Sequence, residues 1–372
     1  MINNPFILYG YESEKYFCDR KEETAHLKRL VTNGNNVTLI APRRIGKTGL
    51  IENLFHQKDI ANQYYTFLID IYATKNIEEM VMTMGTSMLS SLRPKGTQVI
   101  QKLISFLSSL RSGITFDVTG NPSWNIEVGD IRMPRTTLDE LFQYMNAADK
   151  PCIIAIDEFQ TVANYHDKNV EALLRTYIQN CRNAHFIFSG SQRTMMGEIF
   201  SNPSRPFFQS TSMMSIGSIP IDHYIPFAKK HFREAGKDIS SQVIEEVYHR
   251  FDGITWYIQR VMNEFFSLTP PQSKCEMDML DSAIINILRS NEFTYQSMLF
   301  QLPPKQKELL IAIAKEKSAQ NITSSAFIKK YRLTSSSSVQ SAIKGLLEKN
   351  FVTSSLGIYE VYDKFFEEWL KK

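Results

Sequence analysis

The stretch LIAPRRIGKTGLI, residues 39–51, contains a phosphate-binding loop pattern with one departure. The usual pattern is G-x-x-x-x-G-K-[ST], and here alanine stands at the first position, Ala41. A strand-like run at 36–40 precedes the loop, and a helix-like run, LIENLF, follows it. This order suits phosphate binding, because the backbone N–H groups at a helix N-terminus attract anions. The alternative is a basic turn that matches the pattern by chance.

Three positions of the loop have a defined chemical role. Gly46 permits close approach of the backbone, Lys47 places an ammonium on the β- and γ-phosphates, and Thr48 offers a hydroxyl to Mg²⁺. Alanine at position 41 costs little if its φ is negative, and about 1 kcal/mol if φ must be positive. The expected nucleotide-binding residues are Pro42, Arg43, Arg44, Ile45, Gly46, Lys47, Thr48 and Gly49. Guanidinium groups suit phosphate, and one of the two arginines is expected to be only solvated.

The run IIAIDEFQ, residues 153–160, is an apolar strand that ends in two carboxylates. After a phosphate loop, Asp157 is expected to support Mg²⁺ opposite Thr48, and Glu158 to polarise the attacking water as catalytic base. The alternative is an acidic pair that caps a helix after a buried strand. The two patterns together favour ATP or ADP with Mg²⁺ as the ligands.

A third strand, in HFIFSGSQRTMM at 185–196, also ends in polar residues. Ser189, Ser191 and Gln192 are candidates to sense the γ-phosphate or to orient the water, although small residues often follow a strand for no such reason. Arg193 and Arg205 come next, and each is either an arginine finger or part of a surface salt bridge.

The order of the segments predicts an α/β fold. Short apolar runs at 36–40, 64–70, 152–157 and 185–190 alternate with helical patterns, which indicates a parallel sheet covered by helices. A β-hairpin is expected to interrupt this order at about 112–131, two or three helices at 225–268, and a linker at 268–274. Three helices and two strands then close the chain, in the order of a winged helix-turn-helix. The predicted domains are a P-loop ATPase core at 1–219, a helical lid at 220–270 and a winged helix at 271–372.

Composition excludes several classes of protein. The 372 residues carry a net charge of +3, too small for a strongly basic nucleic-acid binder. The four cysteines have no metal-ligand spacing and no disulfide pattern. No run is long enough to span a membrane, and the first ten residues do not read as a signal peptide. We expect a cytoplasmic protein with no membrane partner.

Seven phrases together resemble the archaeal-type ATPases, a branch of the AAA+/STAND class of P-loop ATPases in archaea and bacteria. They are NPFILYG, YFCDRKEETAHL, APRRIGKT, IAIDEFQ, FIFSGSQ, FDGITWYIQ and YEVYDKFFEEWL, and they cover almost the whole chain. The resemblance implies an ATPase core, a helical lid and a winged helix, with Phe17 and Arg20 near the adenine. Thr255 stands where related lids have proline, and Arg260 is either a lid arginine or solvated.

The expected function is a slow, Mg²⁺-dependent ATPase that acts as a conformational switch. The alternatives are a nucleotide-dependent DNA-binding regulator and a protein scaffold with little hydrolysis of its own. The third helix of the winged helix would read DNA, and its non-core positions are Gln340, Ser341, Lys344, Glu348 and Lys349. This face is only mildly basic, which favours an unidentified protein partner or self-association over DNA.

Overall fold

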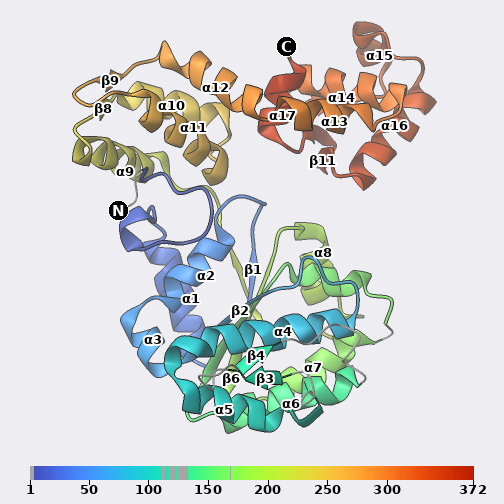
Figure 1. Cartoon of the computed structure of the whole chain (residues 1–372). Helices are drawn as coiled ribbons and strands as arrows, with labels where there is room; N and C mark the ends of the chain where they lie inside the picture. The colour runs from blue at the N-terminus through green and yellow to red at the C-terminus, as the bar shows by residue number, and fades with distance from the viewer. Residues whose placement is uncertain (1–3, 110–113, 117–121, 125–132, 168) are drawn as a thin grey trace. The chain divides into compact units, whose positions relative to one another are not determined.

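The computed structural model describes residues 4–109, 114–116, 122–124, 133–167 and 169–372. The chain forms two compact units (Figure 1). The first unit is Tyr9–Ile219, and the second combines Met1–Leu8 with Pro220–Lys372. Within the described part of the chain, no helix has both the length and the apolar character that crossing a membrane requires.

The first unit is built on a parallel sheet of five strands in the order β2-β5-β6-β1-β7. The strands are β1 (Val37–Ile40), β2 (Tyr65–Asp70), β5 (Cys152–Asp157), β6 (Ala184–Gly190) and β7 (Ser212–Ser215). The first four confirm the prediction to within one residue. β7 was not predicted, because this short edge strand pairs only with β1 and its sequence, SMMS, lacks a long apolar run.

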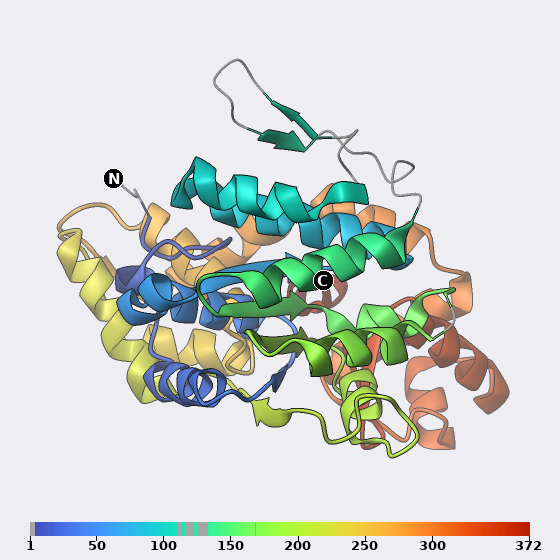
Figure 2. The same ribbon diagram turned by 90° about the horizontal axis from the view of Figure 1, so that it is seen from below.

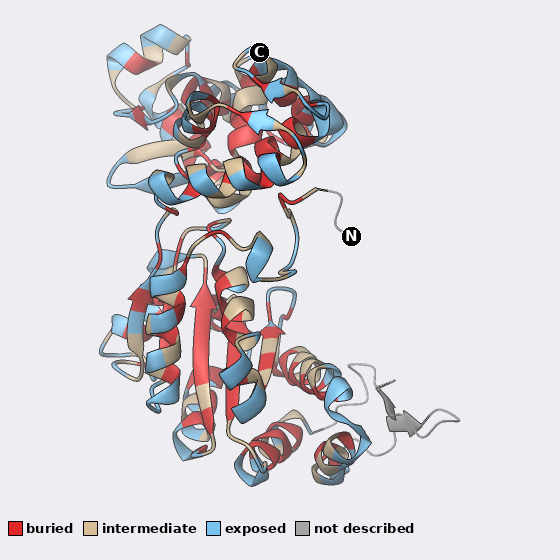
Figure 3. Cartoon of the chain, turned by 90° about the vertical axis from the view of Figure 1, so that its left-hand side faces the viewer, coloured by how far each residue is buried: buried red, intermediate tan, exposed pale blue. Residues whose placement is uncertain are grey.

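Helices cover both faces of this sheet. They are α1 (Lys21–Thr32), α2 (Lys47–Phe55), α3 (Lys58–Gln63), α4 (Ile77–Leu92), α5 (Thr97–Phe106), α6 (Pro134–Ala147), α7 (Val170–Asn180) and α8 (Arg193–Ser201), with short 3₁₀ turns η1 (Glu14–Tyr16), η2 (Arg93–Lys95) and η5 (Phe159–Asn164). On one face, the helices α4, α5, α6, α7 and α8 form a single hydrophobic core with sheet residues such as Ile154, Phe186 and Phe188. The alternate residues, such as Ile187, are buried as well, and α1 contacts β1 and β6. The helices on the two sides of the sheet can be followed in Figures 2 and 3. Burial on both faces explains why these strands are apolar throughout.

The predicted hairpin lies partly outside the described residues. Two short strands, β3 (Ile114–Phe116) and β4 (Pro122–Trp124), pair antiparallel within the expected segment at 112–131. Before this segment, Ser109 donates from its backbone nitrogen to Glu140 of α6 at 3.0 Å, and its hydroxyl donates to the other oxygen of Glu140 at 2.5 Å. The start of the excursion is therefore anchored to α6.

The second unit begins with three helices, α9 (Ile221–Glu234), α10 (Ser241–Arg250) and α11 (Thr255–Leu268). Two-residue strands β8 (Asp238–Ile239) and β9 (Lys274–Cys275) pair in parallel, and α12 (Met279–Ser290) then packs against α11. α12 lies inside the segment predicted as the winged helix, yet it packs on the helices predicted as the lid. A division of this unit at residue 270 stays a prediction.

The C-terminal part has the predicted winged-helix order, with additions. The elements are α13 (Glu292–Phe300), α14 (Pro304–Glu316), β10 (Ala319–Gln320), α15 (Ser325–Tyr331), α16 (Ser336–Glu348), β11 (Val352–Ser355), β12 (Ile358–Val361) and α17 (Lys364–Leu370). Leu356 and Gly357 both have positive φ and connect β11 to β12 as a two-residue hairpin turn. β10 adds a third strand beside β12 that was not predicted, because two residues give no periodic signal.

The N-terminal residues belong to the second unit, although the chain then enters the first. The Phe6 ring is fully buried and lies 5.7 Å from the ring of Phe232 and 6.0 Å from that of Phe266. Asn4 donates to the carbonyl oxygen of Asn263 at 2.9 Å, and Asn263 donates to the carbonyl oxygen of Phe6 at 2.9 Å. The chain consequently passes between the units twice, after Leu8 and after Ile219.

Candidate nucleotide site

The loop at 41–46 leaves the inner strand β1 and ends at the N-terminus of α2. Gly46 has φ of 102°, and nothing lies within 4 Å of the place where a Cβ would stand. Arg44 also has positive φ, 67°, but Ala41 does not. Ala41 is completely buried. The unusual alanine therefore stands in an ordinary backbone conformation, and it carries no left-handed strain.

Lys47 is the first residue of α2, and its side chain is only 6% exposed. Its ammonium donates to the carbonyl oxygens of Ala41 and Pro42 at 3.5 and 3.4 Å, longer than the usual range of about 2.7–3.2 Å. Burial lowers the pKa of Lys47, while the Glu158 and Asp157 carboxylates oppose that shift. Among the residues that the structure describes, the hydrogen bonds of this buried ammonium are both long, and a cation so placed at a helix N-terminus fits a phosphate ligand.

Asp157, the last residue of β5, accepts hydrogen bonds both from the phosphate-loop segment and from β6. Thr48 donates its hydroxyl hydrogen to Asp157 Oδ2 at 2.7 Å, and Ser189 at the end of β6 donates to Asp157 Oδ1. The backbone nitrogen of Glu158 also donates to Oδ1, at 3.0 Å. The carboxylate is thus fixed beside the Thr48 hydroxyl. Residues that the sequence placed in separate patterns lie together here.

Glu158 follows Asp157 in the left-handed conformation, with φ of 55°. This turn aims its side chain toward the end of β6, where Ser191 donates to Oε2 at 2.8 Å and Gln160 donates to the same oxygen. Ser191 was a predicted candidate, and Gln160 was not. A glutamine after a strand carries no signal of its own, and its proximity to Glu158 follows from the left-handed turn.

Two further carboxylates lie near this pair. Asp70 ends β2, in register with Asp157, and burial raises its pKa with help from Asp157 and Glu158, against a hydrogen bond from the Tyr72 backbone. Burial also raises the pKa of Glu52 on α2. Even so, in the part of the chain that the structure describes, no three such side chains converge on a metal-binding position. A Mg²⁺ ion held here would need phosphate and water oxygens as well, which is its usual way of binding.

The two predicted adenine-side residues both lie against the loop and α2. Phe17 packs on α2, because a Cβ built on Gly49 would lie 3.3 Å from its ring. Arg20 is 2% exposed and fully engaged with protein, pairing with Glu23 at 2.7 Å and donating to the carbonyl oxygens of Ile45 at 3.3 Å and Gly217 at 2.6 Å. Arg20 therefore supports the backbone of the loop.

Other predicted residues do not join the acidic pair. Gln192 is exposed at the start of α8, and its side chain forms no hydrogen bond with the described residues of the site. Arg205 pairs with Glu171 at 3.2 Å, in agreement with the salt-bridge alternative. Arg43 is exposed above the ring of Tyr72, at 5.3 Å. Arg260, in the second unit, pairs with Glu264 at 3.6 Å.

Gly190 is the position in this site where a methyl group has the least room. A Cβ there would lie 2.4 Å from Oε1 of Gln160 and 2.5 Å from the sulfur of Met196, both buried. We expect Gly190→Ala to lower the free energy of unfolding by about 1–3 kcal/mol, measured by chemical denaturation, because a packed core must shift. Gly197→Ala in α8 is the control: nothing crowds that position, and alanine should stabilise the helix by up to about 1 kcal/mol. Equal effects at both positions would contradict this steric account.

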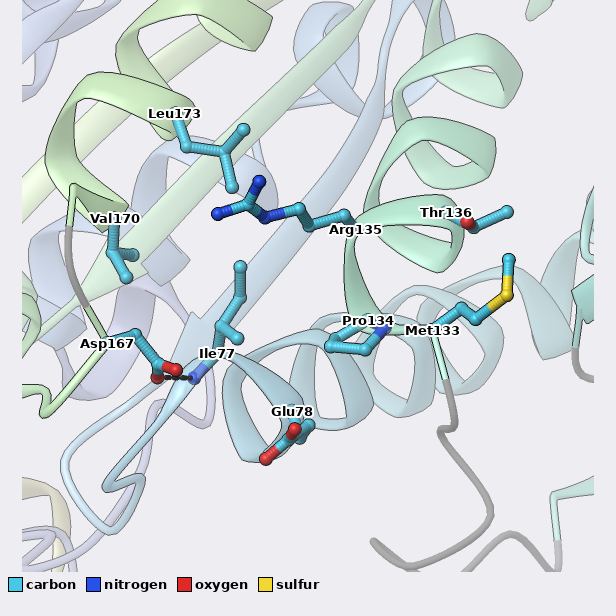
Figure 4. A pocket seen from close by; sticks show the side chains of 9 residues that line it. All are labelled: Ile77, Glu78, Met133, Pro134, Arg135, Thr136, Asp167, Val170 and Leu173. Atoms are coloured by element: carbon cyan, nitrogen blue, oxygen red, sulfur yellow. Dashed lines mark hydrogen bonds between the residues drawn. The ribbon is translucent and has the colours of Figure 1, made fainter.

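A separate cavity of about 400 Å³ lies at the starts of α4, α6 and α7 (Figure 4). Its charged side chains are Glu78, Arg135 and Asp167, and Asp167 accepts a hydrogen bond from the backbone nitrogen of Ile77 at 3.0 Å. No residue of the loop at 41–49 lines it. We assign this cavity no part in the chemistry at Lys47 and Glu158.

Two family models match the chain. Residues 17–261 match a model described as an "ATPase domain predominantly from Archaea", and residues 293–372 match one described as a "probable winged helix domain". The first match covers well over half of the chain and includes every residue of the candidate site. No curated protein gives a significant match.

Several solved structures share this fold. A Walker-type ATPase of Pyrococcus abyssi is 19% identical, with a TM-score of 0.67, over 99% of this chain and 100% of that one. The Aeropyrum pernix ORC2 protein, in complexes with ADPNP and ADP, is 12% identical with a TM-score of 0.62, over 98% and 95% of the two chains. The Aeropyrum pernix ORC1 protein in complex with DNA is 12% identical with a TM-score of 0.51, over 95% and 92%. At these identities the likeness establishes the fold.

Proposed function

The chain belongs to the family of ATPase domains found predominantly in Archaea, and from this premise we propose that it binds ATP with Mg²⁺ and hydrolyses it slowly as a conformational switch. The observation that carries the proposal is a hydrogen bond between the segment that follows β1 and the end of β5. Lys47 and Thr48 come after β1, Asp157 ends β5 and Glu158 follows it, and the hydrogen bond from Thr48 to Asp157 connects the two segments. A phosphate-binding group and a carboxylate base thus share one edge of the sheet.

Each residue has a distinct part in this proposal. The backbone of the loop and the Lys47 ammonium bind the β- and γ-phosphates, and the Glu158 carboxylate accepts a proton from the attacking water. Mg²⁺, when bound, supplies charge neutralisation at the phosphate oxygens, and Thr48 and Asp157 are the residues that would hold it. Ser189 keeps the Asp157 carboxylate in place through its hydrogen bond to Oδ1. Phe17 and Arg20 are proposed to lie beside the adenine ring of the nucleotide.

Slow turnover is proposed because arginine has no established place at the reacting phosphate. Arg205, one of the two candidates, is already paired with Glu171, and Arg193 is exposed at the start of α8. An arginine finger from another molecule can raise phosphoryl transfer by about 10³-fold or more. A second copy of the chain or another protein is therefore the proposed source of faster turnover.

The test is phosphate release from ATP by the purified protein, followed with Mg²⁺ and after chelation with EDTA. We expect release that is slow, saturable in ATP and lost on chelation. Release that is unaffected by chelation would contradict a role for Mg²⁺. If ATP stabilised the protein against heat without any phosphate release, the chain would be a nucleotide-binding scaffold instead of an enzyme.

DNA binding is the second candidate function, and the winged helix at 293–372 is the observation that favours it. The related ORC1 protein was solved in complex with DNA. In α16 of this chain, however, Lys344 lies 4.0 Å from Glu348, and both are exposed, so this face of the helix carries charges of both signs. We therefore propose that this part docks protein in preference to DNA.

The charge pattern of α16 gives a direct test of DNA binding. We expect fluorescence anisotropy to detect no duplex binding tighter than about 1 μM at 0.15 M salt, the range of non-specific contacts. Tighter binding that falls with salt, and that is lost in Lys344→Glu/Lys349→Glu, would establish the DNA function. The control is Lys315→Glu/Lys317→Glu, which makes the same charge change outside α16.

A further inference from the structure

Gln160 is a buried polar residue beside the proposed base. Its side chain is 3% exposed, and its amide nitrogen donates to Oε2 of Glu158. The Ser191 hydroxyl, directly after β6, donates to the same oxygen at 2.8 Å. The other oxygen, Oε1, accepts no hydrogen bond from the residues that the structure describes.

Packing alone does not explain a glutamine here. Its amide oxygen is buried and lacks a hydrogen-bond partner among the described residues, which destabilises the fold relative to an apolar side chain of the same size. The amide also lies against Gly190, where any Cβ would come within 2.4 Å of that oxygen. The buried oxygen of Gln160 is unfavourable, and the side chain fits only because residue 190 is a glycine. The interaction that offsets this is the hydrogen bond that the Gln160 amide donates to Glu158.

We propose that Gln160 is a positioning residue, which together with Ser191 holds Oε2 of Glu158 and so leaves Oε1 to accept the proton of the attacking water. The inference rests on the proposed ATPase function. The left-handed backbone of Glu158 directs its side chain toward the end of β6, and two donors from separate elements then fix the carboxylate. A base held in one orientation spends more of its time in reach of the water than a freely rotating one.

The variant Gln160→Met tests this inference, because methionine keeps the length and apolar stem but cannot donate a hydrogen bond. We expect kcat to fall about 10- to 100-fold, within the contribution of a general base, with unchanged affinity for ATP. The melting temperature should be at least as high as that of the unaltered protein, because the unpartnered oxygen is gone. Gln143→Met on α6, an exposed glutamine outside the site, is the matched control and should leave kcat unchanged.

Two further variants separate positioning from a structural role. Ser191→Ala should lower kcat by itself, and Gln160→Met/Ser191→Ala should be less than additive, because both residues act on one oxygen. In a Glu158→Gln protein, Gln160→Met should lower the residual turnover no further. The inference would be overturned, and the proposed ATPase function left standing, by an unchanged kcat in Gln160→Met. It would also be overturned if the loss of activity were accompanied by weaker ATP binding or by a lower melting temperature. Absence of turnover in the unaltered protein would overturn the proposed function and this inference together.

Discussion

Glu158→Gln is expected to lower kcat at least 100-fold while ATP still binds with the affinity of the unaltered protein. The amide has the size of the carboxylate but cannot accept a proton from water, and general-base catalysis contributes about 10²- to 10⁴-fold. Glu158 lies outside the loop at 41–49, so the phosphate contacts proposed for Lys47 and the loop backbone are untouched. The change therefore removes the chemical step and leaves the binding step.

The measurement for Glu158→Gln pairs single-turnover hydrolysis with equilibrium binding of a fluorescent ATP analogue. Glu198→Gln on α8 makes the same substitution at an exposed carboxylate and should behave as the unaltered protein. If Glu158→Gln retained full turnover, Asp157 or Asp70 would have to be reconsidered as the base. Both lie at the same edge of the sheet, in register with one another.

Lys47→Met is expected to remove the stabilisation of the protein by ATP. The unaltered protein should gain about 2.7 kcal/mol in free energy of unfolding when free ATP is a hundredfold above its Kd. Lys47 is buried, and within the described part of the chain its ammonium makes two hydrogen bonds to carbonyl oxygens, both long, so its favourable partner is proposed to be phosphate. Methionine keeps the buried stem, and without ligand the variant should be at least as stable, because burial disfavours the charged form.

Thermal unfolding at a series of ATP concentrations measures this loss. Lys58→Met, an exposed lysine at the start of α3, is the control and should keep the full ATP-dependent shift. A Lys47→Met protein that is stabilised by ATP as strongly as the unaltered one would mean that the loop does not bind phosphate. A Lys47→Met protein that is unfolded without ligand would instead assign Lys47 a role in folding.

The sequence predicts the fold well where periodicity is strong. Four of the five strands in the sheet are apolar runs long enough to recognise, and glycine, lysine and threonine at 46–48 mark the start of α2. β7 and β10 escape prediction because each is short and depends on pairing with a strand far away in the sequence. α12 shows a different limit: it follows the linker predicted at 268–274 and contacts both α11 before the linker and α17 at the end of the chain, and contacts of this kind cannot be read from the sequence.

The candidate site was predictable in its parts but not in its connections. Spacing identifies Thr48, Asp157 and Ser191, because each stands at or after the end of a strand-like run. The hydrogen bonds between them depend on which strands are neighbours, and the order β5-β6-β1 cannot be read from the chain. The role of Arg20 was equally hidden, because its partners at Ile45 and Gly217 lie far apart in sequence.

The anchoring of Asn4 and Phe6 on the second unit bears on how these parts can be exchanged between proteins. A domain joined by one linker can be cut out and replaced as a single contiguous cassette. Here Phe6 packs against Phe232 of the second unit, although the two residues are 226 positions apart in the sequence. A chimaera that received residues 220–372 from a relative would need matching residues 4–8 as well, or it would leave a hole where the Phe6 ring belongs. An exchange of the second unit of this chain therefore has to include two segments at once.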